Sequence, residues 1–335
     1  MHTRRFWAAP FIAAAIAVLA AGCVSSGGSA ALTSVLSKPE VADITVAAIP
    51  AVDLAGLYIA QDRGLFAAQG LHVTLEPIPS SQSVIADQLK GKVDISAGSY
   101  VAYIAAEVAG ARFRILAEAS TLAPDTRALV VTGNSPITTI AALAGKKIGV
   151  NGVNSIGTLL ISALLSAHGI SPAKVTFITD PGGFPVMPLQ LQQGEWSAAF
   201  LAEPYITFAG EQYGEEVLAD LDQGAVLNLP VDGFVATQAW AQKYPKTAAA
   251  FVRAIEQGQA IANGDASAVQ AVMAKYDNLP PQVTAAMALP RYPVGPVVEA
   301  SVQRVARVMQ QTGILGQADA TQAEQRALVE AMVAP

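Results

Sequence analysis

The chain has 335 residues, of which 52% are hydrophobic, with a formal net charge of −6 and a single cysteine. The acidic balance provides no basic surface for nucleic acid, and one cysteine excludes intrachain disulfides and thiol-based metal clusters. Once an export segment is removed, the chain is long enough for two lobes of ordinary domain size.

The N-terminus is typical of an export signal. Arg4 and Arg5 precede an apolar run that is shorter than the ~20 residues of a membrane-spanning helix. The run ends in Leu-Ala-Ala-Gly-Cys, which resembles, imperfectly, a bacterial lipoprotein box. We expect residues 1–22 to be a lipoprotein signal peptide, Cys23 to be lipidated and residues 23–40 to form a flexible tether. An ordinary signal peptide with a chance cysteine is the alternative.

The first predicted structural unit follows the tether. Apolar runs at 44–49 and 72–78 predict two strands, and apolar residues at helical spacing between them predict a helix. Asp53 stands at the expected N-cap, and Gly64 and Gly70 can adopt the left-handed conformation that ends helical turns. The unit has the length of a βαβ crossover, which predicts an open α/β sheet.

The same stretch carries the opening motif of a known family, D-x-x-G-x-Y-x-A-x-x-x-G-x-F-x-x-x-G-L-x-V. The matching positions are Asp53, Gly56, Tyr58, Ala60, Gly64, Phe66, Gly70, Leu71 and Val73. The chain therefore resembles the NMT1/THI5-like and nitrate/sulfonate/taurine-binding solute-binding proteins of ABC transporters. The resemblance implies an α/β fold of the periplasmic-binding-protein type II class, with two lobes, a hinge and a central cleft.

The first lobe continues with a helix at 81–90 and a short strand that ends in Gly98, Ser99 and Tyr100. Ligands of open α/β sheets bind beyond the carboxyl ends of strands, so these three residues are candidate ligand contacts. They could equally form a turn and cap for the following helix. Further strands are predicted at 113–119 and 127–132.

The second lobe begins near residue 133 in this interpretation. Asn151, Asn154 and Ser155 precede a long apolar helix, whose N-terminal amides could hold a polar or anionic group. Glu203 follows a predicted strand and is either a ligand contact, which we favour, or a helix N-cap. Asp232 begins a strand that returns to the first lobe.

The sequence offers little for catalysis. After removal of the signal only His72 and His168 remain as histidines, and the folded part has no cysteine. The sequence contains no G-x-S-x-G elbow, no G-x-G-x-x-G and no Walker loop. We therefore expect no catalytic residue, no metal, no cofactor and no enzyme activity.

We expect residues 41–132 and 231–335 to form the first lobe and residues 133–230 the second. From the N-terminal pattern we expect the protein to be lipid-anchored on the extracytoplasmic face of the cell membrane, in the periplasm or at the cell surface. The resemblance implies that it captures a small organic solute for an ABC permease and its ATPase, and we expect a monomer that does not contact nucleic acid. The expected ligand contacts are Val52, Asp53, Gly98, Ser99, Tyr100, Asn151, Asn154, Ser155, Glu203 and Asp232.

These contacts include no Arg or Lys, which are the usual partners of a bound anion. We therefore expect a neutral or cationic nitrogen-bearing ligand of the pyrimidine-precursor kind, with Tyr100 or Tyr58 available to stack on a flat ring. The alternatives are a sulfonate, taurine or nitrate binder, a solute-sensing lipoprotein and a desulfinase-like enzyme.

Overall fold

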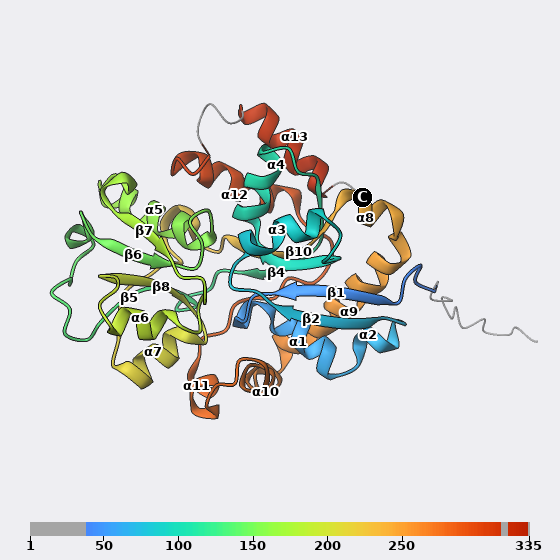
Figure 1. The fold of residues 1–335 in the computed structure, drawn as a ribbon, viewed down its shortest axis with the longest axis horizontal. Helices are drawn as coiled ribbons and strands as arrows, with labels where there is room; N and C mark the ends of the chain where they lie inside the picture. Colours follow the sequence, from blue (N-terminus) through green and yellow to red (C-terminus); the bar gives the residue numbers. More distant parts are fainter. Residues whose placement is uncertain (1–37, 316–320, 334–335) are drawn as a thin grey trace, which may run out of the picture. The chain divides into compact units, whose positions relative to one another are not determined.

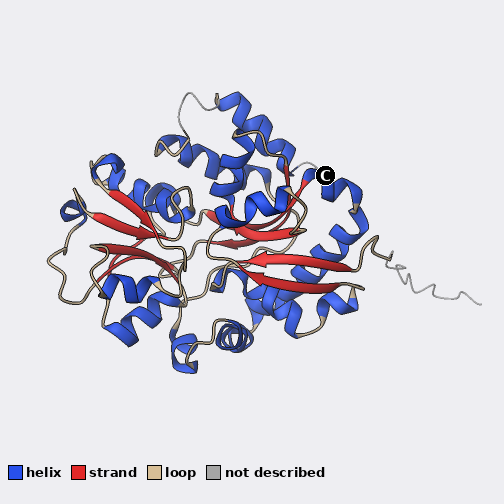
Figure 2. Cartoon of the chain, in the orientation of Figure 1, coloured by secondary structure: helices blue, strands red, loops and turns tan. Residues whose placement is uncertain are grey.

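The computed structural model describes residues 38–315 and 321–333. The expected signal peptide, Cys23 and nearly all of the expected tether lie outside the described residues. The described part contains two five-stranded sheets with helices on both faces (Figure 2). None of the described helices is long and apolar enough to cross a membrane.

The first sheet consists, in spatial order, of β2 (His72–Pro77), β1 (Asp43–Ala48), β3 (Ile95–Ser99), β10 (Pro230–Thr237) and β4 (Phe113–Thr121). β1 pairs in parallel with β2 and β3, whereas β10 is antiparallel to β3 and β4. Every residue of β3 is buried, as expected for a central strand covered on both faces.

The second sheet repeats this pattern. Its spatial order is β7 (Thr176–Thr179), β6 (Lys147–Val150), β8 (Ala198–Ala202), β5 (Arg127–Val131) and β9 (Glu216–Asp220). β6 is parallel to β7 and β8, and β5 is antiparallel to β8 and β9. The two sheets therefore form two α/β lobes of the type II periplasmic-binding class, as predicted (Figure 1).

The chain crosses between the sheets twice, and the first crossing corrects our predicted boundary. Because β5 pairs with β8 and β9, residues 127–132 belong to the second lobe and not to the first. The crossing lies between the end of β4 at Thr121 and the start of β5 at Arg127. An apolar strand such as β5 has the same composition in either sheet, so its sequence did not show which strands it would pair with. The second crossing leads into β10, which begins at Pro230.

Helices cover both faces of the first sheet (Figure 1). On one face, α1 (Ala55–Asp62) and α2 (Leu65–Ala68) pack against α9 (Pro245–Gly264), with α10 (Ala266–Tyr276) beside α1. On the other lie α3 (Ser81–Leu89), α4 (Tyr100–Val108), α12 (Glu299–Gln311) and α13 (Gln322–Val333). The shorter α8 (Gln238–Lys243) and α11 (Pro281–Ala286) complete the C-terminal part.

The second lobe carries α5 (Ile156–Ala167), α6 (Met187–Gln192) and α7 (Tyr205–Tyr213). Short 3-10 turns are η1 (Val52–Leu54), η2 (Ile140–Leu143), η3 (Pro172–Lys174) and η4 (Gly224–Val226). One apolar core lies between the first sheet and α1, α9 and α10, and a second runs from α4 and α12 into the second sheet and α5. The second core is continuous across both lobes and ties them together.

The loop after β1 differs from the prediction at Asp53. This residue lies inside η1, and α1 begins at Ala55 without a side-chain cap, so Asp53 is not an N-cap. Gly64 and Gly70 do adopt positive φ angles, 67° and 78°, which confirms their predicted left-handed conformation. The carboxylate of Asp53 is thereby free to point away from the helix axis, toward the other lobe.

Candidate functional site

A pocket lies between the two sheets, where strands of both lobes bring their ends together. β1, β3 and β6 end beside it, while β5 and β10 begin beside it, the usual place for ligands in α/β sheets. Its cavity volume is about 10 Å³, roughly the space of a single water molecule, so the walls from the two lobes lie close together. Its lining comprises Ile49, Ala51, Leu54, Ser81, Ala97, Gly98, Ser99 and Asp232 of the first lobe and Arg127, Asn151, Ser155, Ile156 and Phe184 of the second.

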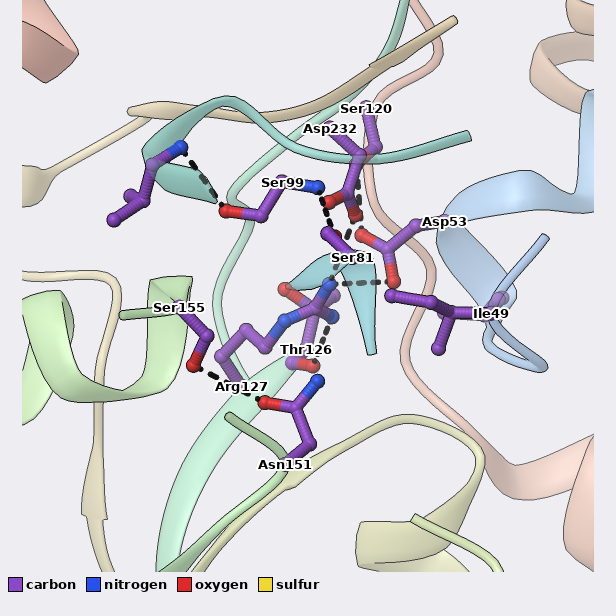
Figure 3. A network of polar contacts seen from close by, with 12 residues as sticks. Ile49, Asp53, Ser81, Ser99, Ser120, Thr126, Arg127, Asn151, Ser155 and Asp232 are labelled. Atoms are coloured by element: carbon purple, nitrogen blue, oxygen red, sulfur yellow. Dashed lines mark hydrogen bonds and ion pairs between the residues drawn. The ribbon is translucent and has the colours of Figure 1, made fainter. Parts of the chain in front are cut away.

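Arg127, the first residue of β5, is the only Arg or Lys among these lining residues. Its side chain is 2% exposed, and its Nη2 lies 2.6 Å from Asp53 Oδ2 and 3.6 Å from Asp232 Oδ2 (Figure 3). Nη1 donates to the Thr126 carbonyl at 3.1 Å. Within the described part of the chain, the buried Nε–H has no hydrogen-bond partner. This donor is therefore available to a ligand oxygen.

The two carboxylates that flank Arg127 have different surroundings. Asp53 also accepts a hydrogen bond from Ser120 Oγ at 2.8 Å, and its side chain is 1% exposed. Asp232 lines the pocket with a side chain that is 10% exposed. Burial, together with the nearby charge of Asp53, raises the pKa of Asp232 well above its usual range, and Arg127 opposes that rise only in part.

Three helices begin at the pocket. Ser81 is the first residue of α3, Ser99 is the N-cap of α4 and Ser155 is the N-cap of α5. Ser99 Oγ accepts from the Val101 amide at 3.2 Å, and Ser155 Oγ donates to the Gly152 carbonyl at 2.6 Å. The partial positive charge of each helix N-terminus therefore acts on the pocket and favours a negatively charged ligand group.

The lobes touch along one edge of the pocket at the start of α3. Gln82 Nε2 donates to the Asn154 carbonyl, and a Cβ added at Gly152 would come within 2.5 Å of Gln82 Oε1. A Cβ added at Gly183 would lie 2.8 Å from the Pro79 carbonyl oxygen. At Gly183, whose φ is 65° and whose neighbour is backbone, only glycine permits this close approach; at Gly152 the neighbour is the end of the flexible Gln82 side chain, which a Cβ would displace.

A second set of contacts between the lobes involves the end of β8. The Val52 amide donates to the Glu203 carbonyl at 3.1 Å, and the Ala288 amide donates to Glu203 Oε1 at 3.2 Å. Together with the α3 contacts, these bonds show that the structure has the two lobes closed on the pocket.

Five of the predicted ligand contacts meet in the pocket, namely Gly98, Ser99, Asn151, Ser155 and Asp232. They come from β3, the loop after β6, the start of α5 and the start of β10. Asp53 lies directly behind them, against Arg127. The structure thus brings together residues that are more than 130 positions apart in the sequence.

Four predicted contacts lie elsewhere, namely Val52, Tyr100, Asn154 and Glu203. Val52 bonds to Glu203 and Tyr292 through its backbone, and Asn154 is exposed at the edge. Glu203 accepts from the amide and hydroxyl of Thr207 in the first turn of α7, although the N-cap of that helix is Pro204 and not Glu203.

The expected aromatic stacking partners are also not in the pocket. Tyr100 is fully buried, with its ring against Gly233, and burial raises the pKa of its hydroxyl. Tyr58 stacks on Tyr276 at a centroid distance of 4.6 Å. The aromatic residue that does line the pocket is Phe184.

Sequence reasoning missed Arg127, Ser81 and Phe184. The premise that the cleft holds no Arg or Lys is wrong, because Arg127 lines the pocket. One signal was present: Arg127 is the sole charged residue of an otherwise apolar, fully buried strand. A buried charge needs a partner or a ligand, which marks such a residue as a candidate. Among the described residues, no cluster of three or more His, Cys, Asp or Glu could hold a metal ion.

Comparison with known proteins adds independent evidence. The family model "NMT1/THI5 like" matches residues 51–268. A protein of Escherichia coli (strain K12), provisionally named an aliphatic sulfonates-binding protein, is 27% identical over 229 residues, which cover 67% of this chain and 68% of that protein.

Two solved structures are similar to this one. The alkanesulfonate-binding protein SsuA from Xanthomonas axonopodis pv. citri, bound to MOPS, superposes with a TM-score of 0.72 at 18% identity, covering 85% of this chain and 98% of that one. The periplasmic nitrate-binding protein NrtA from Synechocystis PCC 6803 superposes with a TM-score of 0.74 at 16% identity, covering 87% and 86%. Both likenesses establish the fold.

Proposed function

This chain belongs to the NMT1/THI5-like family, and on that premise we propose that it is the solute-binding protein of an ABC importer. It captures a small solute between its lobes and delivers it to a membrane permease that is driven by a separate ATPase. The observation that carries the proposal is a pocket closed from both lobes around a buried guanidinium with one partner-free donor. That arrangement suits capture and release of a ligand.

The ligand that we propose carries an acidic oxygen-rich group, such as a sulfonate or nitrate. Arg127 Nε–H, the Ser99 and Ser155 helix ends and the Asn151 amide supply donors to such oxygens. Our expectation of a neutral or cationic ligand rested on a cleft without Arg or Lys, and Arg127 removes that premise. The names of the similar proteins, which bind sulfonates and nitrate, point in the same direction.

The small pocket limits the size of the group that it encloses. Ile49, Leu54, Ile156 and Phe184 form the apolar part of the wall, against which a short hydrocarbon tail would pack. A short alkanesulfonate combines such a tail with three acceptor oxygens, so it satisfies both the polar and the apolar lining.

Calorimetric titration tests the ligand class directly. Methanesulfonate, taurine, nitrate and an aminopyrimidine are titrated into the protein at about pH 6.5 in an amine buffer, since sulfonate buffers could compete. We expect micromolar or tighter binding of at least one of the first three, unchanged in the exposed-charge control Glu211→Gln. Binding of the aminopyrimidine with no binding of any acidic ligand would refute the proposal.

The proposed location is the extracytoplasmic face of the membrane, anchored through lipid on Cys23. The support is the sequence pattern at the N-terminus, because Cys23 lies outside the described residues. Fractionation of the host expressing wild type or Cys23→Ala tests the anchor. We expect wild type to need detergent for release and the variant to be extracted without it; equal extraction of both would contradict lipidation.

A further inference from the structure

Asp232 and Asp53 share one guanidinium but differ in how tightly they hold it. Asp53 lies 2.6 Å from Arg127 Nη2 and has the additional bond from Ser120 Oγ. Asp232 lies 3.6 Å away, and no other described group donates to its carboxylate. Figure 3 shows both carboxylates directed at Arg127, with Asp232 beside Ser99. Asp53 is therefore the tightly bound counter-ion of Arg127. Asp232 is bound more weakly and lines the pocket, where it would face a ligand.

The charges in this cluster do not balance when both acids are ionised. One guanidinium faces two carboxylates, which gives a net charge of −1 in a buried setting. An anion placed in the same pocket would add a second negative charge close to Asp232, where low dielectric makes repulsion strong. A carboxyl group relieves such crowding by taking up a proton, as in pairs of acids that share one site.

We propose that Asp232 takes up one proton from solvent when an anionic ligand binds, so that this single carboxyl sets the ligand charge that the pocket accepts. The inference rests on the proposed function, because it concerns the ligand of the same site. In the bound state the protonated carboxyl of Asp232 faces the ligand as a hydrogen-bond donor. The negative charge of Asp53 and the positive charge of Arg127 then cancel within their ion pair.

No other nearby group replaces Asp232 in this role. The tyrosines around the cluster are neutral, because burial raises the pKa of their hydroxyl groups. Two further buried acids lie near the cluster, Glu118 on β4 and Glu203 after β8, and burial raises the pKa of both. Glu118 accepts from the Val298 amide at 3.0 Å, Glu203 accepts from Thr207 and from the Ala288 amide, and neither lines the pocket. The titratable or charged groups around the cluster of Asp232, Asp53 and Arg127 are Tyr100, Tyr103, Glu118, Glu203 and Tyr292.

The test is proton counting by calorimetry. Methanesulfonate and nitrate are used because they stay fully ionised, and each is titrated between pH 6 and pH 9 in two amine buffers of different ionisation enthalpy. We expect close to one proton taken up per ligand on the alkaline side, and an affinity that falls about tenfold for each pH unit there. Toward pH 6 both effects should fade, because Asp232 is then protonated before the ligand arrives.

Two variants assign the proton to its residue. Asp232→Asn should bind the anions with no proton uptake and little pH dependence, whereas the matched buried-acid control Glu118→Gln should keep the wild-type profile. Proton uptake that survives Asp232→Asn would overturn the inference. If Asp232→Asn fails to fold, the number of protons that the wild-type protein takes up per bound ligand decides whether the inference stands.

The two proposals fail in different ways. Anion binding without proton uptake at any pH would overturn this inference and leave the proposed ligand class intact. Failure of both anions to bind at every pH would overturn the ligand class and this inference with it.

Discussion

Asp53 Oδ2 lies 2.6 Å from Arg127 Nη2, and this buried ion pair joins the turn after β1 to the first residue of β5. The two residues belong to different lobes, and both side chains are at most 2% exposed. A pair of this kind gains little net stability over apolar packing, because both ions lose their hydration. Its effect is to fix where the second lobe starts relative to the first, beside the pocket.

Removing one partner of this pair should be costly. We expect Asp53→Ala to lower the free energy of unfolding by about 1–3 kcal/mol, because Arg127 loses its 2.6 Å partner and Ser120 Oγ loses its acceptor, while Asp232 at 3.6 Å still balances the charge of Arg127. Urea denaturation followed by circular dichroism measures the change. The exposed pair of Asp87 and Lys92 supplies the control, and Asp87→Ala should fall within the error of the measurement. Equal effects of the two substitutions would contradict the role of burial.

Arg127 itself should govern affinity through geometry as well as charge. We expect Arg127→Lys to weaken binding of the best anionic ligand by about 2–5 kcal/mol, because lysine keeps the charge but lacks the Nε–H and the planar fork. Calorimetry gives the affinity, and a melting curve confirms that the variant is folded. Undiminished affinity would show that Arg127 only balances the two carboxylates.

The close contact between Gly152 and Gln82 should matter for closure. We expect Gly152→Ala to weaken ligand binding by no more than several-fold, because the new Cβ would meet Gln82 Oε1 at 2.5 Å and this flexible side chain would have to turn aside for the lobes to close. Gln82→Ala in the same chain should restore much of the loss, with a coupling energy of about 1 kcal/mol in a double-mutant cycle. Small-angle scattering with saturating ligand should show a larger radius of gyration for Gly152→Ala alone. Additive effects of the two substitutions would contradict a contact across the edge.

Asp277 should make stability depend on pH. Both of its carboxylate oxygens are buried without a described partner, and burial raises the pKa of Asp277 from 3.8 to about 7. The folded state therefore favours the protonated form, and the stability present in acid is lost progressively between about pH 4 and pH 7. We expect Asp277→Asn to stabilise the fold at pH 8 by up to about 4 kcal/mol and to have little effect at pH 4.

Chemical denaturation of wild type and Asp277→Asn at matched pH values measures this difference. Glu211→Gln, at an exposed position on α7, should show no such pH dependence. A difference between wild type and Asp277→Asn that stays constant from pH 4 to pH 8 would mean that the carboxyl is ionised throughout.

The sequence predicted those parts of the pocket that follow from local patterns. Ser99, Asn151 and Ser155 stand where a buried strand gives way to polar residues, which is visible without knowledge of the fold. Arg127 could not be placed this way, because β5 runs antiparallel and presents its first residue to the pocket. Strand direction within a sheet depends on pairing with distant segments, which no local pattern records.

Side-chain direction explains the remaining errors. Tyr100 directly follows Ser99, yet its ring turns beneath Gly233 and away from the pocket. Glu203 follows a strand as predicted, but Thr207 and Ala288 supply donors that hold its carboxylate outside the pocket. The directions of both side chains depend on residues from other helices and strands. The sequence therefore predicted that Tyr100 and Glu203 lie near the pocket, but not whether their side chains enter it.

The contacts along the edges of the pocket also limit how fast a ligand can come and go. A solute cannot pass while Gln82 holds the loop at Asn154 and the Pro79 carbonyl lies against Gly183. Only molecules with the lobes apart can exchange ligand, so the observed association rate should level off at the opening rate when solute is abundant. Delivery to a transporter would then be governed by how often this edge parts and not by how often solute collides with it.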